Sequence, residues 1–129
     1  MFIYRTFLLS LLKGEVNMAG DQFVAELMNT DYTPGPDDTW EAVDAFKITE
    51  SEPMQVIFNP SLDEDGTLCL NIQEGGITWT DVSGECGSII IRKDDLMVAQ
   101  YKLTTNRTFF QSNFKWEFTD FCMKFDFEE

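Results

Sequence analysis

The sequence predicts a mainly β protein, built as a single antiparallel β-sandwich or barrel-like domain of about seven strands with one short N-terminal helix. After Pro53, short runs of β-branched and aromatic residues alternate with turn residues at near-even spacing, as in an antiparallel meander. The 129 residues are 43% hydrophobic and 14% aromatic, which suffices for the packed core of one domain. The pattern does not choose between a sandwich and a barrel.

Residues 1–17 precede the predicted domain. The apolar run Phe7–Leu12 is too short for a membrane span, and Arg5 interrupts it as a signal-peptide core. Lys13-Gly14-Glu15 can be encoded by codons that contain a bacterial ribosome-binding sequence, and Met18 follows at a workable distance. We therefore expect residues 1–17 to be a non-native or upstream-translated leader, with a signal peptide as the alternative.

Residues 18–36 are predicted to form a short helix and a Pro/Gly loop. Within Asp21–Thr30, apolar residues recur at the spacing of one helical face, and Asp21 is a plausible N-cap. These apolar residues are Phe23, Val24, Leu27 and Met28. Pro34-Gly35-Pro36 then forbids regular structure. Thr39–Lys47 carries conflicting helical and strand signals.

Residues 37–129 are predicted to form the mainly β, acidic domain. The expected strands are Met54–Phe58, Thr67–Gln73, Ile77–Val82, Gly87–Arg92, Leu96–Leu103, Phe109–Phe118 and Phe121–Phe127. Asp65-Gly66 and Gly75-Gly76 suit tight hairpin turns with positive φ, and Lys93-Asp94-Asp95 is a short polar turn. The alternation slips by one residue at Thr119-Asp120, which requires a bulge, a bend or a turn. We expect a β-bulge, because it keeps the large apolar residues on one face.

Composition excludes several classes of function. With 9 Lys and Arg against 23 Asp and Glu, the net charge is −14, so the chain lacks the basic footprint that binds nucleic-acid phosphates. The absence of histidine excludes Ser-His, Cys-His and imidazole-metal sites from one chain alone. Paired carboxylates remain, but glycoside hydrolysis needs a long cleft. We expect no enzyme and no cofactor, because no nucleophile, base and orienting group can be nominated together.

Cysteine and aspartate spacing gives no metal site. Cys69, Cys86 and Cys122 are isolated from one another, unlike clustered thiolate ligands, and an odd count without a clear secretion signal favours reduced thiols in the cytoplasm. Asp63-Glu64-Asp65-Gly66 has part of a calcium-loop pattern, but Ile72 stands where the bidentate Glu should be. We interpret this cluster as a hairpin turn and keep a calcium-binding β-sandwich module as an alternative.

The acidity suggests a binding function. A net charge with a magnitude of about 2 to 8 is enough to keep a small domain soluble. The magnitude of this chain's net charge of −14 is larger. We expect a non-enzymatic acidic module of phage or bacterial origin that binds a basic protein surface, with inhibition of a nucleic-acid-binding host or defence protein by charge mimicry as one form of that binding. We expect no direct contact with nucleic acid or membrane. The candidate partner-binding residues are Glu50, Glu52, Asp63, Glu64, Asp65, Asp94 and Asp95, with Trp40 or Trp79 as anchors if exposed.

A structural role is the alternative. In this interpretation the chain is a β-sandwich subunit of a virion or another assembly, and an edge strand at Met54–Phe58 pairs with a neighbour. The sequence does not predict the oligomeric state.

Overall fold

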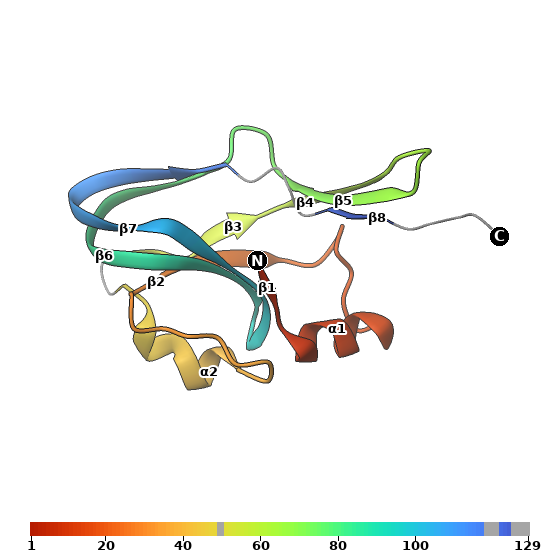
Figure 1. Ribbon diagram of the computed structural model, residues 1–129, viewed down its shortest axis with the longest axis horizontal. Coiled ribbons are helices and arrows are strands. Elements are labelled where there is room, and N and C mark those ends of the chain that lie inside the picture. Colours follow the sequence, from red (N-terminus) through yellow and green to blue (C-terminus); the bar gives the residue numbers. More distant parts are fainter. Residues whose placement is uncertain (49–50, 118–121, 125–129) are drawn as a thin grey trace.

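The computed structural model describes residues 1–48, 51–117 and 122–124, and it has two antiparallel sheets (Figure 1). The five-stranded sheet has the order β1-β7-β6-β2-β3, and the three-stranded sheet has the order β4-β5-β8. The strands are β1 (Phe2–Ile3), β2 (Phe23–Met28), β3 (Met54–Val56), β4 (Phe58–Leu62), β5 (Thr67–Ile72), β6 (Ile77–Lys93), β7 (Leu96–Trp116) and β8 (Cys122–Lys124). The helices are α1 (Arg5–Leu12) and α2 (Trp40–Val43), the latter continued by the 3-10 turn η1 (Asp44–Phe46). The predicted mainly β, antiparallel class is confirmed.

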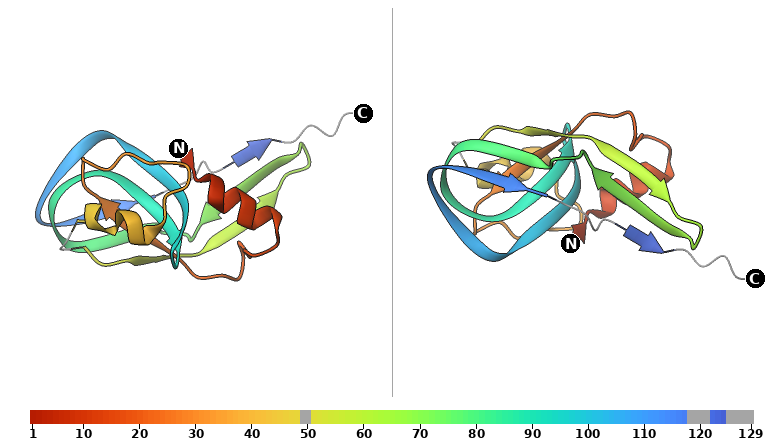
Figure 2. Two further views of the ribbon diagram at one scale, coloured as in Figure 1. Left: turned by 90° about the horizontal axis from the view of Figure 1, so that it is seen from below. Right: turned by 90° about the horizontal axis from the view of Figure 1, so that it is seen from above.

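Strands β6 and β7 form one long hairpin where the sequence predicted four separate strands. The ladder continues through Ser83-Gly84-Glu85 because register shifts absorb the extra residues, and Asp81 and Gln111 take positive φ angles of 56° and 45° at these irregularities. Bulges bend a strand and increase its twist. The hairpin accordingly curls over itself, so that the two ends of each strand face one another across the core (Figures 1 and 2).

Strand β2 replaces the helix that we predicted over Asp21–Thr30. It lies between β6 and β3, and all of its residues except Val24 are buried. A strand buried on both faces has apolar residues at consecutive positions, which also satisfy helical spacing. The prediction was wrong because pairing with two neighbours decides the conformation of such a run, and the short N-terminal helix lies instead at Arg5–Leu12.

Residues 1–17 pack into the domain, against our expectation that they lie outside it. Phe2 pairs with Gln100 of β7, which makes β1 an edge of the five-stranded sheet. Tyr4 and Phe7 are 0% and 2% exposed. This packing does not test where translation starts, so Met18 as the natural start stays a prediction.

A chain of buried hydroxyl groups attaches the N-terminal segment to the Pro/Gly loop. The Tyr4 and Tyr32 hydroxyl oxygens lie 2.5 Å apart, and the Tyr32 hydroxyl donates to Asp38 Oδ2 at 2.9 Å. The same carboxylate oxygen accepts from the backbone N–H of Gly35 at 2.8 Å. Arg5, at the start of α1, pairs with Asp37 in the same loop. These contacts give the loop after β2 a fixed position over the sheet.

The predicted turns form, but one of them connects different elements. Asp65-Gly66 closes the β4–β5 hairpin, and Asp94-Asp95 closes the β6–β7 hairpin. Gly75 and Gly76 take the expected positive φ angles of 89° and 72°. This turn passes from β5 in one sheet to β6 in the other, so it is a corner and not a hairpin. The bulge predicted at Thr119-Asp120 lies outside the described residues.

The buried N-terminal segment makes a stability prediction. Phe7→Ala should lower the free energy of unfolding by about 3–5 kcal/mol, the usual effect of emptying a buried aromatic site. Leu12→Ala, on the same helix but 85% exposed, should change it by less than about 0.5 kcal/mol. Urea unfolding followed by tryptophan fluorescence measures both. Equal midpoints for the two variants would show that α1 is not part of the cooperative fold.

The tyrosines predict a pH dependence. Burial raises the pKa of Tyr4 to about 12, and burial also raises the pKa values of Tyr32 and Tyr101 above the ordinary value. An unfolded tyrosine ionises near about pH 10. Between about pH 10 and 12 the unfolded state therefore binds fewer protons than the folded state, and the free energy of unfolding falls as pH rises.

Tyrosinate absorbance should detect this shift. The chain has 3 tyrosines, so the folded protein should show almost no ionisation at about pH 10. The same protein in concentrated urea is the control and should titrate normally. A midpoint near the ordinary value under native conditions would contradict the buried hydroxyl chain.

Candidate functional site

The structure separates the predicted partner-binding residues into three places. Glu52 is exposed before β3, Asp63-Glu64-Asp65 is exposed at the β4–β5 turn, and Asp94-Asp95 is exposed at the β6–β7 turn. Glu50 lies outside the described residues. The two turns lie far apart in each view (Figures 1 and 2). Within the described part of the chain, no three Asp, Glu or Cys side chains form a group that could hold a metal ion.

The β6–β7 turn meets helix α2. The backbone N–H of Trp40 donates to the carbonyl oxygen of Asp95 at 3.0 Å, and the N–H of Glu41 donates to Asp95 Oδ1 at 2.7 Å. The first turn of a helix has unpaired N–H groups that a carboxylate can cap. Asp95 thus acts as a cap from a distant part of the chain. This contact joins the turn to α2.

We call the resulting surface the acidic end, which consists of Glu41, Asp44, Asp94 and Asp95. All four side chains are exposed. Within the described residues none of them forms an ion pair. Sequence reasoning missed Glu41 and Asp44, because only the folded chain brings α2 against the β6–β7 turn.

A buried charge cluster lies beneath the acidic end. Glu26 of β2 is 1% exposed, and its Oε2 accepts hydrogen bonds from Arg92 Nε at 3.1 Å and Nη2 at 2.9 Å. Lys47 Nζ lies 3.5 Å from the other carboxylate oxygen, Oε1. Arg92 also donates from Nη1 to the carbonyl oxygen of Asp94 at 2.9 Å. The cluster therefore links the centre of the sheet to the turn that carries the acidic end.

Neither candidate tryptophan anchor is freely exposed. The guanidinium carbon of Arg92 lies 4.6 Å from the centre of the Trp40 ring, a cation–π contact that holds this half-buried side chain against the sheet. Trp79 is 1% exposed, and its Nε1 donates to the backbone oxygen of Glu52 at 2.9 Å. Trp79 is a core residue and cannot anchor a partner.

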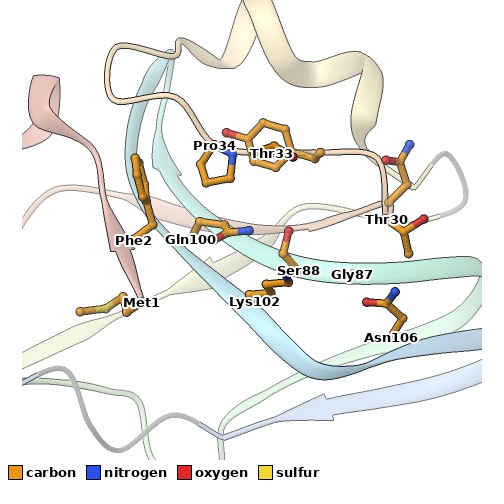
Figure 3. Close-up of a pocket in the computed structure, with 12 residues that line it drawn as sticks. Met1, Phe2, Thr30, Thr33, Pro34, Gly87, Ser88, Gln100, Lys102 and Asn106 are labelled. Carbon is orange, nitrogen blue, oxygen red and sulfur yellow. The ribbon is translucent and has the colours of Figure 1, made fainter.

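A pocket lies beside the buried charge cluster, on the face of the five-stranded sheet that carries Glu26. It has a volume of about 460 Å³ and is bounded by β6, β7, the start of β1 and the loop after β2 (Figure 3). Its lining residues are Met1, Phe2, Asn29, Thr30, Tyr32, Thr33, Pro34, Gly87, Ser88, Gln100, Lys102 and Asn106. A Cβ atom on Gly87 would lie 3.0 Å from Thr30 Cα, so this glycine lets the loop pack closely on β6.

Neither Cys86 nor Cys69 is a reactive free thiol. Burial raises the pKa of the Cys86 thiol to about 11, so this free thiol is protonated and unreactive at neutral pH. Cys69 is disulfide-bonded, which contradicts our expectation that its thiol is reduced. The backbone of Cys69 lies opposite that of Cys122 in the β5–β8 ladder. The sequence alone gave no sign that β5 and β8 are neighbours.

No helix among the described residues is long and apolar enough to cross a membrane. Comparison with protein-family models, with curated proteins and with solved structures finds no match to the chain.

The buried cluster makes a prediction that distinguishes it from surface ion pairs. Arg92→Ala leaves the Glu26 carboxylate without its main partner, so it should lower the free energy of unfolding by about 3–5 kcal/mol. Lys115→Ala removes one partner of an exposed pair with Glu117 and should cost less than about 1 kcal/mol. Urea unfolding compares the two variants.

A double variant tests whether charge burial causes the loss. Glu26→Met combined with Arg92→Met removes both charges of the hydrogen-bonded pair and should recover part of the stability that Arg92→Ala loses. An Arg92→Ala variant as stable as Lys115→Ala would contradict the cluster's role.

Proposed function

We propose that the protein is a non-enzymatic binding module whose acidic end engages a basic surface on another protein. The observation that supports this proposal is the grouping of Glu41, Asp44, Asp94 and Asp95 where α2 is hydrogen-bonded to the β6–β7 turn, without ion pairs among the described residues. Carboxylates held in fixed positions attract a basic partner from a distance and orient it during the encounter.

The proposed partner is a nucleic-acid-binding protein of a bacterial or phage-infected cell. Such proteins carry grooves of Lys and Arg that neutralise phosphates. An acidic end on a folded scaffold offers these grooves an alternative set of negative charges. Occupying the groove would inhibit the partner, which makes charge mimicry the mechanism of this proposal.

Within the acidic end, Asp95 differs from the other three residues because it also has a structural role. Its Oδ1 accepts the N–H of Glu41, so this carboxylate also stabilises α2. The side chains of Glu41, Asp44 and Asp94 make no hydrogen bond or ion pair within the described residues. These three can be neutralised with little effect on the fold.

A second candidate function is assembly into a larger structure. Strand β3 lies at an edge of the five-stranded sheet, as the alternative requires. Leu8, Leu9 and Leu12 leave 41%, 52% and 85% of their surfaces exposed on α1. These features would favour contacts that are apolar or made through the backbone. Such contacts persist at high salt, unlike the proposed charge pairing.

Two variants with the same net charge test the proposed function. Glu41→Gln, Asp44→Asn and Asp94→Asn together neutralise the acidic end, whereas Asp63→Asn, Glu64→Gln and Asp65→Asn neutralise the β4–β5 turn. Either set converts three carboxylates to amides and changes the net charge from −14 to −11. The immobilised proteins are exposed to a nuclease-treated bacterial lysate, and captured proteins are identified by mass spectrometry.

The unmodified protein and the β4–β5 variant should retain one basic nucleic-acid-binding protein, and the acidic-end variant should lose it. Duplex DNA should compete, and binding should weaken as ionic strength rises from about 0.1 M to 1 M, where the Debye length falls from about 10 Å to 3 Å. Equal losses in both variants would show a response to net charge alone. A salt-resistant oligomer of the pure protein would instead favour assembly.

A further inference from the structure

The polar pocket is formed by one face of the five-stranded sheet. Residues opposite one another on paired strands point to the same side of a sheet. The ladder pairs Ser88 with Lys102 and with Met28, and it pairs Ile90 with Gln100 and with Glu26. The ladder thus places Ser88, Lys102, Gln100 and Glu26 on one face. That face lies under the loop after β2.

Ser88 carries a buried hydroxyl group that has no hydrogen-bond partner among the described residues. Its side chain is 2% exposed, and its Oγ makes no hydrogen bond to any described residue. An unsatisfied buried polar group costs about 1–3 kcal/mol, so native proteins rarely retain one without a reason. Figure 3 shows Ser88 projecting from β6 into the space beneath Thr33 and Pro34. The hydroxyl is therefore positioned to bind whatever occupies that space.

Gln100 adds an amide to the same place. It is 5% exposed, and its side chain makes no hydrogen bond within the part of the chain that the structure describes. In Figure 3 its amide group ends beside Ser88, with Phe2 on one side of the pocket and Thr30 and Asn106 on the other. Amides and hydroxyls both donate and accept hydrogen bonds, which suits a ligand rich in hydroxyl groups.

Lys102 gives the pocket a positive charge. None of the twelve described lining residues is Asp or Glu, although acidic residues number 23 in the chain. Lys102 is exposed at the pocket and has no ion-pair partner among the described residues. A ligand with one negative group would meet a cation here and no opposing carboxylate. The volume of about 460 Å³ lies within the usual range for small-molecule sites.

We propose that this pocket binds a small hydroxylated anion, of the kind represented by a sugar acid or a sugar phosphate. The anionic group pairs with the Lys102 ammonium group, and the hydroxyl groups bind Ser88, Gln100 and Asn106. Phe2 supplies an apolar wall. The site uses residues other than those of the acidic end, so this proposal does not depend on the proposed function and is tested separately.

Amide NMR spectra with three probes test the proposal. D-glucuronate carries a carboxylate, glucose 6-phosphate carries a phosphate, and D-glucose is the uncharged control. At least one of the two anions should cause saturable shifts of the Gly87, Ser88 and Gln100 amide signals, and D-glucose should bind more weakly. The anion that binds more tightly identifies the charged group. The absence of saturable shifts with both anions, or equal affinity for D-glucose, would overturn the proposal.

Two substitutions separate binding from folding. Lys102→Met should weaken anion binding by about tenfold or more, because it removes a charge-assisted contact. Lys13→Met removes the same charge from an exposed residue outside the pocket and should leave affinity unchanged. Ser88→Ala should weaken binding while maintaining or raising the urea midpoint, since it removes an unsatisfied hydroxyl. A lower midpoint with unchanged affinity would assign Ser88 a purely structural role and overturn its place in the site.

Discussion

The ion pair between Glu26 and Arg92 is the contact on which the position of the acidic end depends. A carboxylate at the centre of a sheet is tolerated only when its charge is compensated and its oxygens are bonded. Arg92 supplies two hydrogen bonds, and Lys47 lies 3.5 Å from the second oxygen. Because Arg92 also contacts Trp40 and the carbonyl of Asp94, the charge that satisfies Glu26 also fixes α2 and the β6–β7 turn. The acidic end is thereby attached to β2, a strand whose residues are all buried except Val24.

The use of basic residues in ion pairs of this kind explains why the acidic end keeps its negative charge. Several of the few basic residues form ion pairs with particular carboxylates. Ion pairs join Arg5 to Asp37, Lys93 to Asp21, and both Lys47 and Arg92 to Glu26. The carboxylates of the acidic end form no ion pair with any described residue. Fold stability and the negative surface thus have a common cause, since the basic residues that stabilise the fold do not neutralise the acidic end.

The sequence predicted the fold class and two hairpin turns because alternation and turn chemistry are local signals. It failed for β2, where residues buried on both faces of a central strand also fit helical spacing. It divided β6 and β7 because the polar runs 83–86 and 104–108 resemble turns between strands, whereas both strands continue through them. It placed Asp94 and Asp95 correctly at an exposed turn. It missed Glu41 and Asp44 because no local pattern shows that α2 contacts that turn.

Two polar groups on one face of the sheet are buried for different reasons. Glu26 and Ser88 are 1% and 2% exposed and lie on the same side of neighbouring strands. The carboxylate, which would be costly alone, has two cations. The hydroxyl has no partner among the described residues, although alanine would fill the same position without that cost. Pairing with two cations accounts for the charge of the first group, whose Oε1 also makes no hydrogen bond to a described residue. Such pairing does not explain the second. Among the described residues, the lining of the pocket above Ser88 has no carboxylate and its Lys102 has no ion pair, which provides the physical reason to assign the hydroxyl to a ligand.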